Sequence, residues 1–79
     1  MKDRLIPLHL LPTGNFAKVA QLTANGTSRR RMLDLGFIKD TVVEALRRSP
    51  SGDPTAYQVR GAVIALRSEE ASHILVEMF

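Results

Sequence analysis

The chain has 79 residues, of which 44% are hydrophobic and 24% charged, and its formal net charge is +3. This length and composition are those of one small globular domain, so we expect residues 1–79 to fold as a single unit. The absence of cysteine excludes disulfides, thiolate metal centres and a cysteine nucleophile, and it suits a reducing cytoplasm. No apolar run approaches the ~20 residues that span a bilayer, so we expect a cytoplasmic protein without membrane insertion.

The first segment, MKDRLIPLHLLP, has a charged start and a short apolar run. Pro7, His9 and Pro12 interrupt that run and no small-residue cleavage site follows, so the pattern does not favour a signal peptide. We therefore expect the segment to be part of the domain. After a turn-like stretch, residues 19–22 have the pattern of a first strand, which can begin as early as Ala17.

A short helix is expected next, beginning at Ser28 and ending before Gly36. The hydroxyl of Thr27 or Ser28 can cap its start by accepting from free backbone N–H groups of the first turn. If Gly36 takes the left-handed conformation, Met32 and Phe37 occupy the two positions that touch in a Schellman motif. The sequence therefore predicts a sharp helix end.

Three consecutive arginines stand at the start of this helix. On a helical projection Arg30 lies opposite the apolar arc and can pair with Asp34 in solvent. Arg29 falls inside the apolar arc, so its stem is expected along the edge of the core with the guanidinium reaching out. Arg31 lies at the border. The side chains thus fan apart, which favours an ordinary solvated face; the alternative is that Arg29 or Arg30 docks on a partner.

Residues 41–48, TVVEALRR, have the pattern of a strand that is partly covered on both sides or interrupted by a bulge. Residues 49–54 are rich in Ser, Pro and Gly and are expected to form a loop. Residues 56–60 would then be the returning strand of a hairpin. Gly61 ends it, and residues 63–66 form another short strand.

Ser68 offers a hydroxyl cap and is followed by two glutamates, the composition of a helix start. We expect about one helical turn that ends near His73, then a closing strand over residues 74–76. The competing interpretation is a helix that continues to Met78. Short strands with brief helical links predict a mainly β fold, a small bent barrel of about five strands with one or two short helices.

The sequence carries no G-x-S-x-G, P-loop or dinucleotide-binding motif, so an enzyme is the last hypothesis. One metal alternative stays open. If the last helix continues, Glu69, His73 and Glu77 share one face at four-residue spacing and form a weak surface site for Fe²⁺ or Zn²⁺. The competing explanation is a solvated helix face, or no shared site at all if Glu77 lies in a strand.

Nucleic acid is the other general alternative, because small barrels often bind it and the net charge is positive. Tyr57 is the only plausible exposed stacking residue, and the arginines are spread over the helix and several strands. We therefore expect no nucleic acid as partner.

Short motifs occur in a specific order along almost the whole chain, from about residue 8 to residue 77. They are LHLLPxG from Leu8, AxV from Ala17, RxxMLxLGFI from Arg29, GDP from Gly52, VRG from Val59, IALR from Ile64, EEA from Glu69 and ILVE from Ile74. This ordered set resembles the FeoA family, the small ferrous iron transport proteins A. A related SH3-like domain occurs at the end of iron-dependent repressors of the diphtheria-toxin-repressor type.

The resemblance implies an SH3-like barrel that acts by binding, without catalysis and with no required cofactor. It implies a cytoplasmic accessory of FeoB, the membrane ferrous iron transporter with a GTPase domain, which it would bind from the cytosolic side and modulate. Simple turn chemistry is a competing explanation for the loop residues among the contact candidates. These candidates are Arg29, Arg30, Lys39, Gly52, Asp53 and Pro54.

One departure from the family pattern follows the helix, where Pro-Gly is frequent and this chain has Lys39-Asp40. Asp tolerates a left-handed backbone better than most residues, so the turn can be kept. Lys39 adds charge to a surface that could meet the partner. The functions that compete with a transport accessory are a nucleic-acid-binding barrel and a metal-sensing module related to the C-terminal domain of those repressors.

Overall fold

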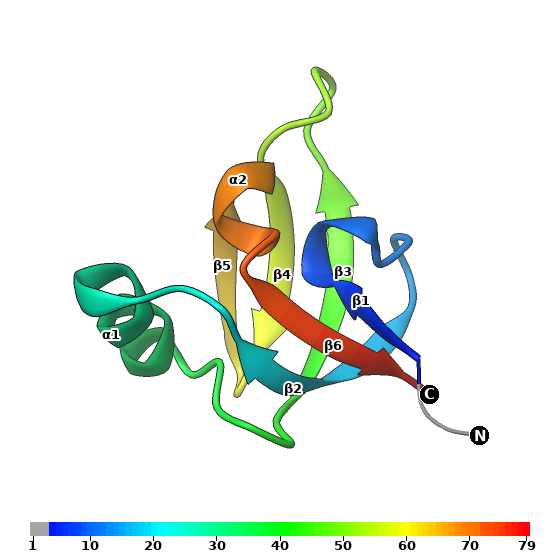
Figure 1. Ribbon diagram of the computed structural model, residues 1–79. Helices are drawn as coiled ribbons and strands as arrows, with labels where there is room; N and C mark the ends of the chain where they lie inside the picture. Colours follow the sequence, from blue (N-terminus) through cyan, green and yellow to red (C-terminus); the bar gives the residue numbers. More distant parts are fainter. Residues whose placement is uncertain (1–3) are drawn as a thin grey trace.

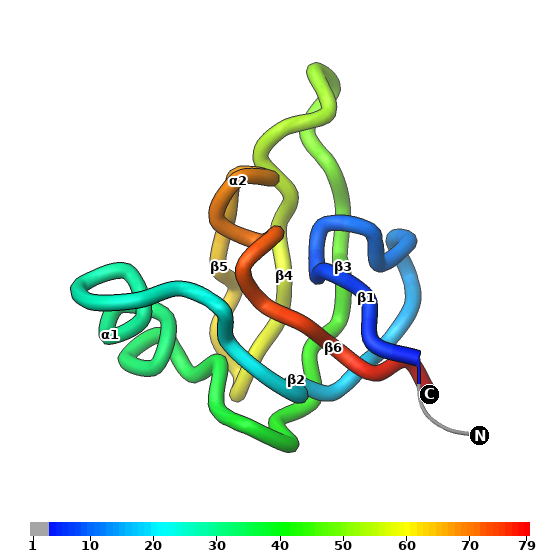
Figure 2. Tube along the Cα trace, viewed as in Figure 1, coloured from blue at the N-terminus to red at the C-terminus, as the bar shows by residue number. Residues whose placement is uncertain are grey.

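The computed structural model describes residues 4–79, which form a six-stranded antiparallel sheet with short helical links (Figure 1). The strand order is β1-β6-β2-β3-β4-β5, and the trace shows the sheet bent around one centre (Figure 2). The predicted mainly β class is confirmed, with six strands in place of about five. The elements are β1 Leu5–Pro7, the 3-10 helix η1 Leu8–Leu10, β2 Phe16–Leu22, α1 Gly26–Leu35, β3 Val42–Arg48, β4 Thr55–Val59, β5 Ala62–Leu66, α2 Ser68–Ala71 and β6 Ile74–Met78.

The additional strand is β1, which pairs with β6 at the end of the sheet. Three residues that end in a proline show no alternating pattern, which is why the sequence does not indicate a strand here. The chain then turns through η1, and Leu8 and Leu11 are completely buried. Residues 4–12 thus pack with the rest of the barrel. Residues 1–3 of the N-terminal segment lie outside the described part of the chain.

Strand β2 joins the two halves of the barrel. It begins at Phe16, earlier than expected, and Lys18 has a neighbour on both sides, Val42 in β3 and Glu77 in β6. A register shift against β6 follows between residues 19 and 21. Such irregularities bend a strand and increase its twist, which a small, strongly bent sheet requires.

Helix α1 begins at Gly26, two residues before the expected start. The residue before it, Asn25, makes no side-chain capping hydrogen bond. The predicted cap by Thr27 or Ser28 is wrong because both residues lie inside the first turn, whereas a capping residue must precede the helix with an extended backbone.

The end of α1 is predicted correctly. Gly36 has a φ of 110°. Its N–H donates to the carbonyl of Leu33 and the N–H of Phe37 donates to the carbonyl of Met32, each at 3.0 Å. These are the two hydrogen bonds of the Schellman motif. Met32 and Phe37 are both buried, so the helix end is also a core contact.

Strand β3 contains the bulge that its mixed pattern indicates, a register shift against β4 between Ala45 and Arg47. Strands β4 and β5 are joined by Arg60 and Gly61, whose φ angles of 51° and 82° are both positive. Two such residues make a tight hairpin turn whose twist matches that of the strands. Because the turn is so short, β5 starts at Ala62, slightly earlier than expected.

Helix α2 has four residues and β6 follows it, so the alternative of a helix to Met78 is wrong. The predicted hydroxyl cap is also wrong, because Ser68 is itself the first helical residue. The acceptor is Asp53 of the β3–β4 loop, whose Oδ1 lies 2.7 Å from the backbone N and 3.0 Å from Oγ of Ser68. A carboxylate distant in the sequence therefore caps this helix.

The core fills the inside of the bent sheet. Tyr57 is 1% exposed, and its burial raises the pKa of the phenol. It lies on the inner face of β4 with Thr55 and Val59, so the prediction of an exposed stacking residue is wrong. The buried apolar residues are Leu8, Leu11, Ala17, Val19, Ala24, Met32, Phe37, Val43, Ala45, Tyr57, Val59, Leu66, Ala71, Ile74 and Val76.

Candidate partner-binding surfaces

Two of the predicted contact residues, Arg29 and Arg30, line a hollow of about 420 Å³ on α1, together with Leu33 and Asp34. Arg29 is exposed, and its guanidinium donates to the carbonyl of Leu22 at 3.3 Å, so it reaches back to the end of β2. Within residues 4–79 no ion pair joins Arg30 to Asp34, and the predicted pairing is not formed. Of Arg29 and Arg30, Arg30 is therefore the residue whose charged side chain is available to a partner.

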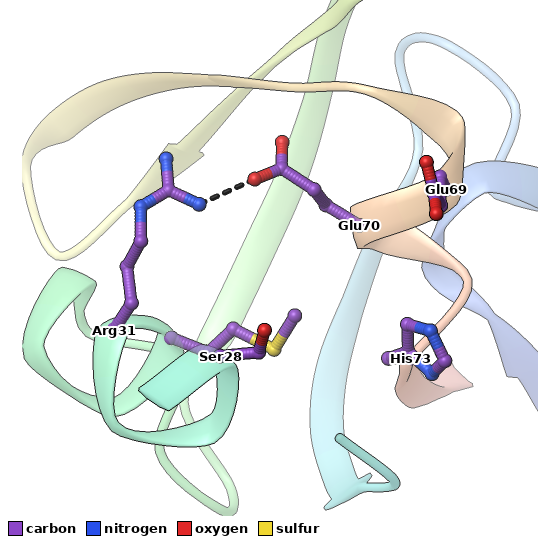
Figure 3. Close-up of a pocket in the computed structure, with 6 residues that line it drawn as sticks. Ser28, Arg31, Glu69, Glu70 and His73 are labelled. Atoms are coloured by element: carbon purple, nitrogen blue, oxygen red, sulfur yellow. Dashed lines mark hydrogen bonds and ion pairs between the residues drawn. The ribbon is translucent and has the colours of Figure 1, made fainter. Parts of the chain in front are cut away.

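Arg31, placed at the border of the helix face by the sequence, connects the two helices (Figure 3). Its guanidinium forms an ion pair with Glu70 of α2. The other carboxylate oxygen of Glu70 accepts from the backbone N–H of Arg67 at 3.1 Å. The N–H of Arg67 and the guanidinium of Arg31 together hold the pKa of Glu70 below its ordinary value. The two residues are 39 positions apart, so no local pattern could indicate the pair.

The ion pair borders a hollow of about 130 Å³ between α1 and α2, which Glu69 and His73 also line. Glu70 points toward Arg31, away from Glu69 and His73 (Figure 3). His73 Nδ1 lies 3.3 Å from the hydroxyl oxygen of Thr23. Two of the three residues of the metal hypothesis are therefore neighbours.

The third residue of that hypothesis, Glu77, lies in β6, opposite Leu5 of β1 and Lys18 of β2. The four-residue spacing required a helix through position 77, and α2 ends at Ala71. Within residues 4–79 no group of three or more His, Cys, Asp or Glu side chains could hold a metal ion. The three-ligand arrangement of the helical alternative is thus not formed.

The 49–54 loop is held by its own hydrogen bonds. The hydroxyls of Ser49 and Ser51 donate to the carbonyl of Asp53 at 2.8 and 3.0 Å, and the Asp53 carboxylate accepts from Ser68. Gly52, Asp53 and Pro54 are half-buried. The carbonyl and the carboxylate of Asp53 are therefore already used in hydrogen bonds within the fold, which strengthens the explanation of this segment by turn chemistry.

Lys39 lies exposed in the loop that follows α1. Its neighbour Asp40 has a φ of 73°, and its N–H donates to the carbonyl of Val19 at 2.7 Å, so the turn is kept without Pro-Gly, as predicted. Figure 1 shows this loop and α1 at one end of the barrel and the 49–54 loop at the other. The predicted contact residues thus form two separate groups.

A third surface was not predicted. Phe16 of β2, Val42 of β3 and Val63 of β5 are large apolar residues on strands, yet they are 48%, 45% and 61% exposed. Alternating apolar residues usually indicate the inner face of a strand. The sequence offers no local signal that tells an exposed apolar strand residue from a buried one.

The FeoA domain, as a family model, matches residues 6–78 of this chain. The chain belongs to the FeoA family. A FeoA protein from Chlorobium tepidum is 32% identical, with 94% of this chain and 70% of that chain covered and a TM-score of 0.87. Stenotrophomonas maltophilia FeoA, solved with zinc and described as an SH3 domain protein, is 34% identical over 87% of this chain and 86% of that one, with a TM-score of 0.79. The predicted SH3-like barrel is thereby confirmed.

The chain is also similar to an Fe(2+) transport protein A/Fe(2+) transporter FeoB fusion protein of Porphyromonas gingivalis, at 32% identity over 75 residues. The matched region covers 95% of this chain but only 8% of that protein. A manganese-dependent transcriptional repressor is 20% identical with a TM-score of 0.87, which shows a shared fold alone. Within residues 4–79, no helix of this FeoA domain has the length and apolar character to cross a membrane.

Proposed function

We propose that this FeoA domain is a non-enzymatic accessory of ferrous iron transport that binds the cytosolic part of a FeoB-type transporter and modulates it. The observation that carries the proposal is the fusion protein, in which a domain similar to 95% of this chain is joined to a FeoB transporter. Fusion keeps two domains at a high effective concentration. Fusion is an advantage when the two domains act together. The same contact between a FeoA domain and a FeoB transporter is then expected when they are separate chains.

The shape of the domain supports a role in binding. Its sheet bends around a packed core, and both loops that carry predicted contact residues are fixed by backbone hydrogen bonds. Surfaces fixed in this way lose little conformational freedom when a partner binds, so binding is not weakened by ordering. A cytoplasmic location follows from the proposal, with recruitment to the inner face of the membrane by the transporter.

Isothermal titration of the purified chain into the soluble cytosolic part of FeoB from the same organism tests the proposal. The titration is made without nucleotide, with GDP and with a non-hydrolysable GTP analogue. Saturable 1:1 binding in at least one state is expected, and an unrelated GTPase in the same three states serves as the control. Absence of binding in all three states would contradict the proposal.

A second candidate function is weak binding of a divalent metal, which is favoured because Glu69 and His73 line one hollow and a related FeoA was solved with zinc. The residues fit only a weak site, since Glu70 is paired with Arg31 and Glu77 lies in β6, beyond the turn that contains His73. Two ligands leave most of a Zn²⁺ coordination shell to water. If the site exists, His73→Gln removes the Zn²⁺-dependent change in the NMR signals of α2, and unchanged signals in the unsubstituted chain contradict it.

A further inference from the structure

The outward side chains of strands β2 to β5 form rows across the sheet. Phe16 lies opposite Glu44, Glu44 opposite Gln58, and Gln58 opposite Val63. Directly opposite residues share one face of a sheet. Their chain neighbours, among them Ala17 and Val43, point to the other face and are buried. We call the exposed side the outer sheet face and define it by Phe16, Val42, Glu44, Gln58, Arg60 and Val63.

This face carries three large exposed apolar side chains, and Glu44 and Gln58 lie between Phe16 and Val63 in the same row. Phe16, Val42 and Val63 are each between 45% and 61% exposed. A hollow of about 270 Å³ lies among Phe16, Val42 and Arg60 on this face. A second one of about 310 Å³ is lined by Arg47 and continues to the outer residues of β4 and β5. Exposed apolar residues among polar ones are typical of protein interaction sites.

The helices leave this face uncovered. No residue of α1 or α2 lines either hollow. The helices instead face each other across the smaller hollow that Arg31 and Glu70 border. The outer sheet face is therefore open to a partner, whereas the surface between the helices is already occupied by an internal ion pair.

The charges around the face select the partner. Lys18, Arg47 and Arg60 are basic, and Glu44 and Glu77 are the acidic members of the same rows, with Glu77 directly opposite Lys18. The basic excess of the rim therefore comes from Arg47 and Arg60. Arg48 lines the second hollow, but its guanidinium already donates to the carbonyl of His9 at 3.3 Å. Complementary charge guides association and excludes wrong partners. A basic rim around apolar side chains fits an acidic segment that also carries apolar residues.

We infer that the outer sheet face docks an acidic, apolar segment of the transporter's cytosolic part, with Phe16 as the anchor; the inference rests on the proposed function. Aromatic and arginine side chains are enriched at protein interfaces, and a few such residues carry most of the binding energy. Nucleic acid fits less well, because base stacking needs several exposed aromatic residues and Tyr57 is buried.

The test compares matched variants in the titration with the cytosolic part of FeoB. Phe16→Ala removes the anchor, and its control is Leu33→Ala, an exposed apolar residue of α1 (38%). Arg47→Glu reverses a charge of the rim, and its control is Arg67→Glu, an exposed arginine before α2 that lies outside the outer sheet face. Arg30→Glu tests the competing surface on α1. We expect about tenfold weaker binding for each variant of the face and less than about twofold change for each control. Glu44→Gln removes the acidic residue of the face and should tighten binding.

The outcomes distinguish a failure of the outer sheet face from a failure of the proposed function. Unchanged binding of Phe16→Ala and Arg47→Glu, with normal binding of the unsubstituted chain, overturns the outer sheet face and leaves the proposed function intact. Loss of binding in the α1 variants moves the interface to the helix. No binding by the unsubstituted chain overturns both. Salt-dependent retention of a DNA or RNA oligonucleotide that Arg47→Glu abolishes would assign the face to nucleic acid instead.

Discussion

The end of α1 and the start of α2 are two helix termini fixed in different ways. At the end of α1, Gly36 and Phe37 complete the motif within one short stretch of chain. At the start of α2, the capping carboxylate is that of Asp53, 15 residues before Ser68. The first terminus is encoded locally. The second combines a local contact, from the N–H of Arg67 to Glu70, with a cap that depends on the β3–β4 hairpin being formed. The comparison shows which features of a small barrel belong to its segments and which to the assembled fold.

The substitution with the largest expected effect acts on the local terminus. Gly36→Ala places a Cβ at a φ of 110° and 3.1 Å from Cδ of Arg60. A non-glycine residue in such a conformation costs about 1–3 kcal/mol, so the free energy of unfolding should fall by that amount in urea titrations. Gly52→Ala is the control, because Gly52 has a φ of 94° with open space around it. The difference between the two losses of unfolding free energy measures the contact with Arg60. No loss for Gly36→Ala would show that the helix end tolerates a side chain.

Most of the fold could be predicted because it rests on local patterns. The helix stop at Gly36, the bulge in β3 and the strand that follows α2 all depend on residues within a few positions of one another. The errors share another property. Strand β1 exists because β6 pairs with it, and the cap of α2 comes from a distant loop. A single sequence does not indicate which segments, distant along the chain, are in contact in the fold.

A moderate effect is expected at the distant cap. Asp53→Ala leaves the N–H of Ser68 without its acceptor, and the loss of a cap costs ~1 kcal/mol, with a range of 0.5–2. Asp53→Asn keeps an oxygen acceptor and should retain most of the stability. Hydrogen exchange should show faster opening of α2 in Asp53→Ala with α1 unchanged. Equal acceleration in both helices would mean that Asp53 stabilises the whole barrel and not one terminus.

The candidate site was less predictable than the fold. Lys39 and Arg30 are exposed as the sequence suggests, but Asp53 is used by α2, and Glu77 is separated from His73 by the change from helix to strand. The exposed face of Phe16 and Val63 was missed because hydrophobicity indicates burial in most strands. Residue types can be read from a sequence, but which of them share a surface depends on the register of strands far apart in the chain.

The smallest expected effect concerns the ion pair between Arg31 of α1 and Glu70 of α2, which joins the two helices. The pair is partly exposed, with side-chain exposures of 55% and 33%, and such pairs contribute about 0.2–1 kcal/mol. A double-mutant cycle with Arg31→Gln and Glu70→Gln should give a coupling in that range.

The pH dependence of stability tests both contacts of Glu70, the hydrogen bond from the N–H of Arg67 and the ion pair with Arg31. The pKa of Glu70 lies below its ordinary value of 4.5 in the folded protein, so the unfolded chain binds this proton more readily. The contribution is then fully present above the unfolded pKa and is lost as the pH falls from there through the folded pKa. Glu70→Gln should flatten the loss of stability in this acid range, whereas Glu69→Gln in the same turn should leave it steep. An equal flattening by both substitutions would mean that the acid sensitivity comes from the general charge of α2 and not from the contacts of Glu70 with Arg67 and Arg31.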